Sequence, residues 1–527
     1  MQIRPAVLIA FLSWAWLSAA IRAAEPVAAD VVLANGLILN GGGGPAVAGS
    51  VAIKGDTIVA VGQFETSGTP YRIDCTGLVI APGFIDLHNH SDEQIVDPKY
   101  RLNANFLTQG CTTVVTGNCG FGPVDVADYY AKIDQLGAGT NIAHLLAHGS
   151  LRGKVVGVDD RRATADELAE MRRLAGVAMQ DGAWGMSSGL IYVPGAYADT
   201  DELVAISEVI AEHGGIYASH VRDEGLQLLI SVNELLEIGR RAKLPVHLSH
   251  FKASGRDAWG LARQAVAVIE QARASGQVVT ADQYPYVASS TSLEATLLPA
   301  WARAGGREKL LERLADAEFG PRIRTEITDA LARKEDGRAI RIARYAPRPD
   351  YIGRDLVQLA EAESLSTLDL VLEIINGGGA AVVHFSMDEG EVRELMQLPW
   401  VATASDGRAE LPSADKPHPR TYGTFPRKIG FYSIHEHVLP LEQAVRSATG
   451  LAADIIGLRD RGYLRTGQAA DIVVFHPETF RDTATFDDPH QYAAGVEYLF
   501  VNGTLAMARG HVTGALAGKP LRKPKKG

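Results

Sequence analysis

Residues 82–92, PGFIDLHNHSD, form the stretch that decides the fold. The apolar run GFIDL is typical of a buried strand, and His88 and His90 follow it two positions apart. Because side chains alternate along a strand, both imidazoles project to the same side. In a parallel α/β barrel the active site lies at the C-terminal ends of the strands. The stretch therefore predicts a strand that carries two metal-competent side chains into a barrel mouth.

Beyond this stretch, short apolar strands alternate with charged helical stretches, such as residues 163–180 and 200–215. This alternation predicts a (β/α)₈ TIM-like barrel over residues 81–459, with an insertion rich in helix and charge at about 290–378. Eight strands suffice for a barrel, but nine candidates are present, so either AAVVHFSM or NIAHLLAHG is extra. The nine candidates are GFIDLHNH, TTVVTGN, NIAHLLAHG, GAWGMSSGL, GIYASHV, LPVHLSHF, QVVTADQYPY, AAVVHFSM and WVATASDG.

The two ends of the chain have a different sequence pattern, in which short predicted strands are separated by Asn-Gly and Gly-Asp turns. Alternating apolar and polar residues around such turns are typical of hairpins. Because these segments bracket the long middle, residues 27–80 and 460–515 are predicted to pair into one small β-sandwich.

Residues 1–24 are predicted to be a secretory signal peptide. Arg4 precedes about 15 apolar residues, fewer than the ~20 that a spanning helix needs, and small residues follow. We therefore expect an exported protein, periplasmic or secreted, with no membrane segment after cleavage. The net charge of −11 over 527 residues argues against nucleic acid as a partner. The basic run RKPKK at the C-terminus is predicted to be a solvated tail.

Six metal-competent side chains stand at the ends of predicted strands. Imidazole, thiolate and carboxylate ligands in this mixture suit Zn²⁺. A lone buried histidine is usually a core residue. Six metal-competent side chains that all stand at strand ends, however, are not explained by packing alone. The six are His88, His90, Cys119, His220, His250 and Asp406.

Disulfides and nucleophilic serine chemistry are both disfavoured. A strand from Cys111 to Cys119 would separate their Cα atoms by about 26 Å, far beyond the ~7 Å limit for a disulfide. Cys75 lies in the β-rich N-terminal segment and is predicted to be structural. The segment GMSSGL resembles a nucleophile elbow only superficially. The sequence therefore favours a metal-activated reaction.

The motifs as a set resemble the D-aminoacylase (N-acyl-D-amino-acid deacylase) family of the amidohydrolase superfamily. The resemblance covers essentially the whole chain after residue 24. It implies that Cys119, His220 and His250 hold a tightly bound zinc, while His88, His90 and Asp406 border a second, weaker position. Many relatives carry a carboxylated lysine on the fourth strand, but the corresponding segment here, GAWGMSSGL, has no lysine. The resemblance therefore implies that Cys119 takes over the bridging role of that lysine. The motifs are PGFIDLHNHSD, GNCGFG, GLIYVPG, YASHVRDEG, LSHFKASG, DQYPY, SDG and HPRTYGTFPR.

The predicted reaction is zinc-dependent hydrolysis of the amide bond of small N-acyl-D-amino acids. Zinc lowers the pKa of its bound water to about 7, and Asp406 can act as general base and then general acid. Preference for the D-isomer is implied by the resemblance alone. The alternative is a related hydrolase acting on a D-dipeptide or on a cyclic amide, as dihydropyrimidinase and hydantoinase do. A non-catalytic barrel would be expected to lose ligands, whereas all six are present.

A substrate of this class carries a free carboxylate, which needs cationic or hydroxyl donors near the metal. An arginine can hold a carboxylate through two hydrogen bonds. The alternative interpretation of Arg222 and of Lys252 is that each forms a salt bridge on the surface or in a loop. The predicted substrate-binding residues are Tyr192, Arg222, Lys252, Tyr284 and Ser290.

Overall fold

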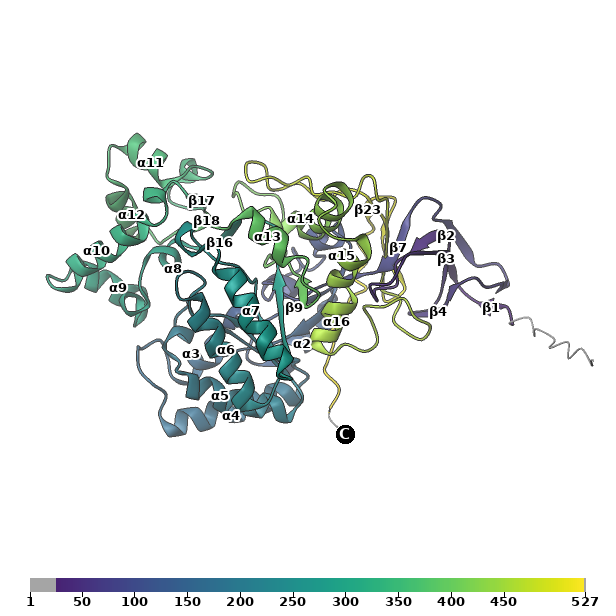
Figure 1. Ribbon diagram of the computed structural model, residues 1–527, viewed down its shortest axis with the longest axis horizontal. Coiled ribbons are helices and arrows are strands. Elements are labelled where there is room, and N and C mark those ends of the chain that lie inside the picture. Colours follow the sequence, from purple (N-terminus) through teal and green to yellow (C-terminus); the bar gives the residue numbers. More distant parts are fainter. Residues whose placement is uncertain (1–24, 526–527) are drawn as a thin grey trace, which may run out of the picture.

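The computed structural model describes residues 25–525 as a mixed α/β protein (Figure 1). The predicted signal peptide, residues 1–24, lies outside this range. Within residues 25–525, no helix is both long enough and apolar enough to span a membrane.

Parallel strands form the centre of the molecule in two sheets. One has the order β10-β9-β8 and the other β11-β12-β13-β14-β15-β19. Every residue of β9 and β12 is buried, as expected for strands covered on both faces. The strands are β8 Phe84–Asp86, β9 Cys111–Thr116, β10 Asn141–His144, β11 Leu146–Ala147, β12 Gly185–Gly189, β13 Ile216–His220, β14 Val246–Leu248, β15 Val279–Gln283 and β19 Val401–Thr403.

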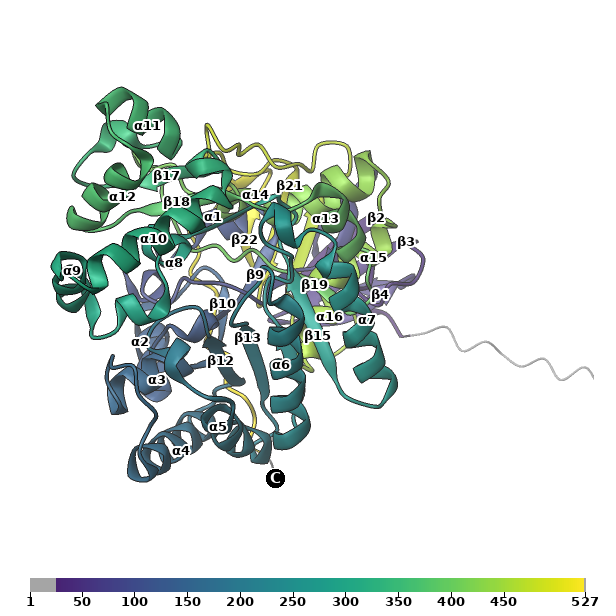
Figure 2. The same ribbon diagram turned by 60° about the vertical axis from the view of Figure 1, so that its left-hand side comes forward.

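The two parallel sheets are connected at both ends. A parallel bridge pairs Asn89, just after β8, with Gly407, just after β19. On the other side, the Trp184 backbone N–H donates to the carbonyl of His144 at the end of β10. Helices follow the strands and lie outside them (Figure 2). These helices are α1 Ala104–Leu107, α2 Val126–Leu136, α3 His148–Val155, α4 Ala165–Gln180, α5 Thr200–Glu212, α6 Leu228–Ala242, α7 Leu261–Ala274, α13 Glu389–Leu395, α14 Arg420–Pro426, the π-helix η8 Arg427–His435, α15 Leu441–Ala448 and α16 Gly450–Ile456.

Helix α4 illustrates how the sequence sets these elements. Thr164 and Glu167 form a capping box that satisfies backbone N–H groups at the N-terminus. Met171, Ala175 and Met179 repeat every four residues and are buried, so one face packs inward. The helix falls within the charged stretch 163–180 that the sequence predicts as helical.

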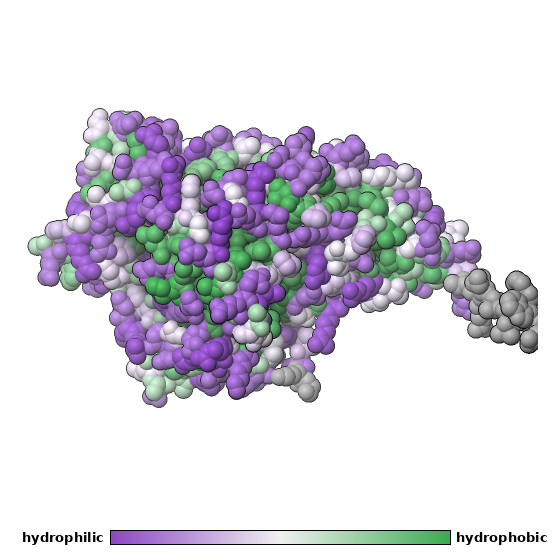
Figure 3. All heavy atoms as spheres, viewed as in Figure 1, coloured by the Kyte–Doolittle hydropathy of each residue, from purple (hydrophilic) through white to green (hydrophobic). Residues whose placement is uncertain are grey.

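Residues 288–385 contribute an antiparallel sheet, β16-β18-β17, and five α-helices. This part carries a hydrophobic cluster of its own, and it projects to one side in Figure 1. On the face shown in Figure 3, apolar residues gather where it meets α7. AAVVHFSM contains β18, so it is the extra strand. The elements are β16 Ala288–Ser292, α8 Leu293–Leu297, α9 Gly306–Ala315, α10 Phe319–Ala332, β17 Ile340–Arg344, α11 Leu356–Glu363, α12 Thr367–Asn376 and β18 Ala381–Phe385.

Strands from both ends of the chain pair with one another as one nine-stranded mixed sheet, where the sequence suggested a sandwich. β7 and β20 join the two ends in antiparallel register, with Ile80 opposite Val474. A separate two-stranded pair, β1 Val27–Ala28 and β5 Thr66–Ser67, lies at the N-terminus. The nine strands are β2 Val31–Ile38, β3 Val47–Lys54, β4 Thr57–Gly62, β6 Tyr71–Asp74, β7 Val79–Pro82, β20 Ile472–Phe475, β21 Val496–Val501, β22 Thr504–Ala508 and β23 His511–Val512.

The basic run at the C-terminus is largely exposed up to residue 525, as a solvated tail would be, but its first two residues contact the rest of the molecule. Arg522 forms an ion pair with Asp134 at 2.6 Å. The Lys523 ammonium lies 5.0 Å from the centroid of the Trp184 ring, within cation–π range.

Candidate metal centre

The six predicted ligands converge at the C-terminal ends of the parallel strands. His88 and His90 follow β8, and His220 is the last residue of β13. The other three adopt left-handed backbone conformations: Cys119 has φ 51°, His250 φ 36° and Asp406 φ 51°. Such conformations cost about 1–3 kcal/mol each in non-glycine residues and cluster at functional sites. The fold therefore holds these three side chains in place at a local energetic cost.

Three of the six form a compact group. The Cys119 Sγ lies 3.8 Å from His220 Nδ1 and 3.6 Å from His250 Nε2, and the two nitrogens are 2.9 Å apart. Tetrahedral zinc with ordinary bond lengths would separate sulfur and nitrogen ligands by about 3.6 Å and two nitrogens by about 3.3 Å. The donor set and its spacing fit a zinc ion.

A second group shares Cys119 with the first. The His88 Nε2 lies 3.2 Å from Cys119 Sγ and 3.5 Å from Asp406 Oδ1. The His90 Nε2 lies 3.0 Å from the same Asp406 oxygen. The sulfur can therefore face two neighbouring metal positions, as the bridging prediction requires.

The electrostatics of the cluster favour charged, ligand-competent forms. Burial raises the pKa of the Cys119 thiol, but His88 and hydrogen bonds from His220 and His250 hold it well below its usual range. Burial likewise raises the pKa of Asp406, whereas the Arg420 guanidinium, 2.7 Å from Oδ2, contributes most to holding it well below its usual range. A thiolate and a carboxylate are the forms that bind a divalent cation.

Three supporting charged residues were not predicted from the sequence. Asp282 accepts from the His250 backbone N–H at 2.7 Å, and its other oxygen lies 2.8 Å from His247 Nε2 and 3.4 Å from His88 Nδ1. Such carboxylates fix the ring orientation and the tautomer of ligating histidines. Asp282 occurs in the motif DQYPY, but only the three-dimensional contacts reveal its role.

Glu224 and Arg420 are the other two. The Glu224 Oε1 lies 2.8 Å from His250 Nδ1 and 2.6 Å from Lys252 Nζ. Burial raises the pKa of Glu224, but Lys252 and the histidines hold it well below its usual range. Glu224 lies in the motif YASHVRDEG and Arg420 lies in the motif HPRTYGTFPR. No periodicity in the sequence distinguishes either residue from its neighbours.

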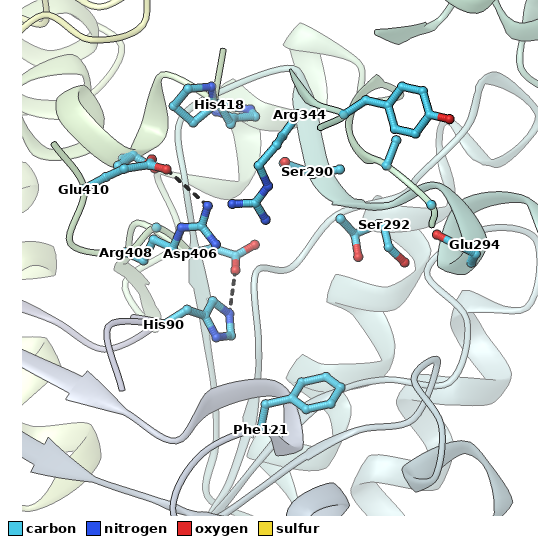
Figure 4. A pocket seen from close by; sticks show the side chains of 18 of the residues that line it. His90, Phe121, Ser290, Ser292, Glu294, Arg344, Asp406, Arg408, Glu410 and His418 are labelled. Atoms are coloured by element: carbon cyan, nitrogen blue, oxygen red, sulfur yellow. Dashed lines mark hydrogen bonds and ion pairs between the residues drawn. The ribbon is translucent and has the colours of Figure 1, made fainter. Parts of the chain in front are cut away.

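Two cavities meet at the cluster, and Tyr192, Ser290 and Asp406 line both. The larger, about 820 Å³, includes His90, Cys119 and Phe121 in its wall (Figure 4). The smaller, about 460 Å³, is lined by His220, His250, Lys252 and Tyr284 among others. A substrate lying across the metal positions would place one part in each cavity.

Four of the five predicted substrate-binding residues line these cavities. The Tyr284 hydroxyl is buried and has no hydrogen-bond partner within residues 25–525. An orphaned buried hydroxyl is costly in a native structure and indicates a missing partner. Tyr192 shares a hydrogen bond with Thr291 at 3.0 Å between the two hydroxyl oxygens.

Arg222 is the exception and requires a correction. It is absent from the walls of both cavities. Its guanidinium binds Glu234 through two hydrogen bonds of 2.9 Å and also donates to the carbonyls of Ala196 and Ala198. After β13 the chain turns toward α6, so this side chain serves a structural ion pair.

Comparison with known proteins agrees with this geometry. Residues 72–506 match the model of the amidohydrolase family. D-aminoacylase of Alcaligenes xylosoxydans xylosoxydans is 36% identical over 94% of this chain and 98% of its own length. N-acyl-D-glutamate deacylase of the same organism is 33% identical over 90% and 93%.

A solved structure of N-acyl-D-glutamate deacylase from Bordetella bronchiseptica is also similar. It is 30% identical, with a TM-score of 0.80, over 94% of this chain and 100% of that one. That protein is complexed with zinc and a phosphonate inhibitor, a mimic of the reaction's tetrahedral intermediate. The chain therefore belongs to the amidohydrolase family, in the branch of the D-aminoacylases and N-acyl-D-amino-acid deacylases.

Proposed function

We propose that this protein is a zinc-dependent hydrolase that cleaves N-acyl-D-amino acids into a carboxylate and a free D-amino acid. The observation that carries the proposal is the convergence of six ligand side chains where two cavities meet. The three relatives named above, all D-specific deacylases by name, support the substrate class.

The residues that would hold a tightly bound zinc are Cys119, His220 and His250, and His88, His90 and Asp406 border a weaker second position. A zinc ion there supplies a Lewis acid that polarises the scissile carbonyl and makes water acidic enough to attack near neutral pH. Asp282 and Glu224 orient the histidine rings and fix which nitrogen faces the cluster.

Asp406 is the proposed proton carrier. Its carboxylate lines both cavities and stays ionised beside Arg420, so it can accept a proton from the attacking water. The same group then donates that proton to the departing amine nitrogen as the amide bond breaks. His90 and Arg420 hold the two carboxylate oxygens in place.

The smaller cavity is the proposed site of the α-carboxylate of the amino-acid half. Lys252 supplies a cation, and the unpartnered Tyr284 hydroxyl supplies a donor for the substrate carboxylate. Ser290 and Tyr192, which line both cavities, are proposed to bind across the junction. These four positions leave Arg222 outside the site.

The proposed architecture places this site in the mouth of a closed eight-stranded barrel. The bridge between Asn89 and Gly407 and the contact between Trp184 and His144 support closure of the two parallel sheets. The strand order would then be β8, β9, β10 with β11, β12, β13, β14, β15 and β19. Residues 288–385 would be an inserted subdomain between the last two strands.

The terminal sheet is proposed to fold over as a small sandwich. A single hydrophobic cluster contains Ile53 and Ile73 from the N-terminal strands together with Val474 and Phe500 from the C-terminal ones. The backbone N–H of Ile58 in β4 also donates to the carbonyl of Gln468. Both contacts support a sheet that curls back on itself.

The function is tested by measuring product release by zinc-loaded enzyme from N-acetyl-D-leucine, N-acetyl-L-leucine, a hydantoin and a D-dipeptide. We expect turnover of the D-acyl substrate and little of its enantiomer. Hydrolysis of the hydantoin or the dipeptide without turnover of any N-acyl-D-amino acid would refute the proposal.

The role of Asp406 is tested by Asp406→Asn. We expect kcat to fall by about 10²–10⁴-fold, the usual contribution of a general acid–base, while zinc stays bound. Metal analysis alongside kinetics separates loss of chemistry from loss of metal. A near-normal kcat would rule out this assignment.

We also propose that the chain is exported and loses its first residues, on the basis of the apolar run in residues 1–24. The N-terminal sequence of the protein recovered from a periplasmic or culture fraction tests this. A protein that stays in the cytoplasm with Met1 intact would contradict it.

A further inference from the structure

Three arginines line the larger cavity, and their partners differ. Arg420 contacts Asp406 at 2.7 Å, and Arg408 donates to Glu410 at 3.1 Å. The Arg344 side chain has no hydrogen bond within residues 25–525, and its single ion pair, with Asp415, is at 4.0 Å. Two of the three positive charges are therefore neutralised by neighbours, whereas the charge of Arg344 is largely free.

The backbone directs Arg344 into the cavity. The pairing of β17 with β18 is irregular between Ile342 and Arg344, which sets Arg344 opposite Ala381. Ala381 in turn pairs with Ser292 of β16, and all three residues line the larger cavity. A β-bulge commonly redirects a side chain beside an active site. Figure 4 shows the Arg344 side chain extending into this space.

From this arrangement we infer that Arg344 is a specificity-determining residue that binds a carboxylate on the part of the substrate in the larger cavity. The inference rests on the proposed function, in which the α-carboxylate occupies the smaller cavity. A guanidinium without a close partner binds a carboxylate through two charge-assisted hydrogen bonds. The second carboxylate could belong to the amino-acid side chain or to the acyl group.

The remaining unpaired charge in this cavity does not cancel that of Arg344. Glu294 forms no ion pair within residues 25–525, and burial raises the pKa of its carboxyl. Figure 4 shows the Glu294 side chain apart from the Arg344 side chain. A cavity of about 820 Å³ is also far larger than an acetyl group requires, so it has room for a longer anionic substituent.

The test compares Arg344→Gln with wild type on three substrates: N-acetyl-D-glutamate, N-succinyl-D-leucine and N-acetyl-D-leucine. The readout is the ratio of kcat/KM for each dianionic substrate to that for N-acetyl-D-leucine. Loss of a hydrogen bond to a charged group predicts that one ratio falls by about 10–100-fold. A fall with N-acetyl-D-glutamate assigns the carboxylate to the side chain, and a fall with N-succinyl-D-leucine assigns it to the acyl group.

Arg341→Gln is the matched control. Arg341 lies on the same strand, pairs with Asp487 at 3.2 Å and is absent from the cavity wall, so both ratios should match wild type. If both ratios are unchanged in Arg344→Gln while wild type hydrolyses N-acetyl-D-leucine, this inference is overturned but the proposed function is not. Failure of wild type to hydrolyse any of the three substrates would instead overturn the proposed function.

Discussion

Cys119 is the residue on which the two ligand groups meet. Its sulfur lies within 4 Å of ring nitrogens of His88, His220 and His250. A left-handed backbone and a depressed thiol pKa both distinguish it from Cys75 and Cys111, whose thiol pKa values are raised by burial. All three cysteines are free and buried, so environment alone separates the proposed ligand, Cys119, from the two core residues.

Replacing this sulfur is therefore expected to empty the proposed tight zinc position. Cys119→Ala should bind less than one equivalent of zinc after dialysis and lose at least about 10²-fold in kcat/KM, because zinc carries the Lewis-acid chemistry. Metal analysis and kinetics on the same sample provide the measurement. Cys111→Ala, a core substitution, should keep its zinc; full zinc occupancy in Cys119→Ala would contradict the ligand assignment.

Glu224 contacts His250 and Lys252, and we propose that it is a positioning residue that acts through them. Glu224→Gln removes the negative charge that stabilises the contacts with His250 and Lys252. Zinc affinity should therefore fall by about 10–100-fold, which is the usual effect of removing a carboxylate that is hydrogen-bonded to a metal-ligating histidine. Competition with a zinc chelator measures the affinity. The control is Glu237→Gln, an exposed residue of α6 paired with Arg240. Equal affinities in both variants would show that Glu224 does not support the ligand.

The sequence was sufficient to predict that the six candidate ligands come together, because strand ends and residue chemistry are local features. It was not sufficient for Asp282, Glu224 or Arg420, because their roles depend on contacts between segments far apart in the chain. For Arg222 the local argument failed: the residue lies two positions after a ligand, but the turn after β13 directs it to Glu234.

At the scale of the element, η8 contains an unusual buried charge. Lys428 is 1% exposed, and its ammonium has no hydrogen-bond partner within residues 25–525. Burial lowers its pKa to about 7. A lysine in the unfolded chain has a pKa near 10.4, so the folded state binds fewer protons between these values.

This difference predicts that stability rises with pH from about 7 to 10, because the penalty for the buried charge is complete below pH 7 and disappears above the unfolded pKa. Lys428→Met should remove that slope and stabilise the protein at pH 7 by up to about 4 kcal/mol. Urea unfolding at pH 6, 8 and 10 provides the measurement. Lys132→Met, an exposed residue of α2, is the control; an unchanged slope in Lys428→Met would contradict the account.

At the scale of the whole molecule, a buried polar network joins the terminal sheet to the parallel strands. Asp471, just before β20, accepts from the Asn141 side-chain amide of β10 at 2.9 Å and from the Asn502 backbone at 2.6 Å. It also pairs with the buried guanidinium of Arg461. The sheet and the parallel strands are therefore linked by a buried hydrogen bond from Asn141 to Asp471 as well as by apolar packing.

Asp471→Ala would leave the Arg461 charge buried without this partner, which typically costs about 3–5 kcal/mol. The melting temperature should fall markedly, while kcat per folded, zinc-loaded molecule stays near wild type, because the network lies apart from the ligands. Calorimetry and kinetics below the transition test both parts. An unaltered melting temperature would mean that the network contributes little to stability.

The alternation of strands and helices was enough to predict the mixed α/β class and the position of the parallel strands. The choice between the two candidates for the one surplus strand required the structure, because AAVVHFSM is as apolar as its neighbours and only its antiparallel pairing reveals its place. The pairing of the chain ends was predictable, but their arrangement as one continuous sheet depends on the junction of β7 with β20.

The central claim is that the cluster around Cys119 needs zinc to hydrolyse N-acyl-D-amino acids. The most direct measurement is a zinc titration of chelator-treated enzyme, following hydrolysis of N-acetyl-D-leucine and its L-enantiomer. We expect no activity without metal and, as the first equivalent is added, activity that develops with the D-isomer alone. Full activity in metal-free enzyme, or equal hydrolysis of both enantiomers, would contradict the account.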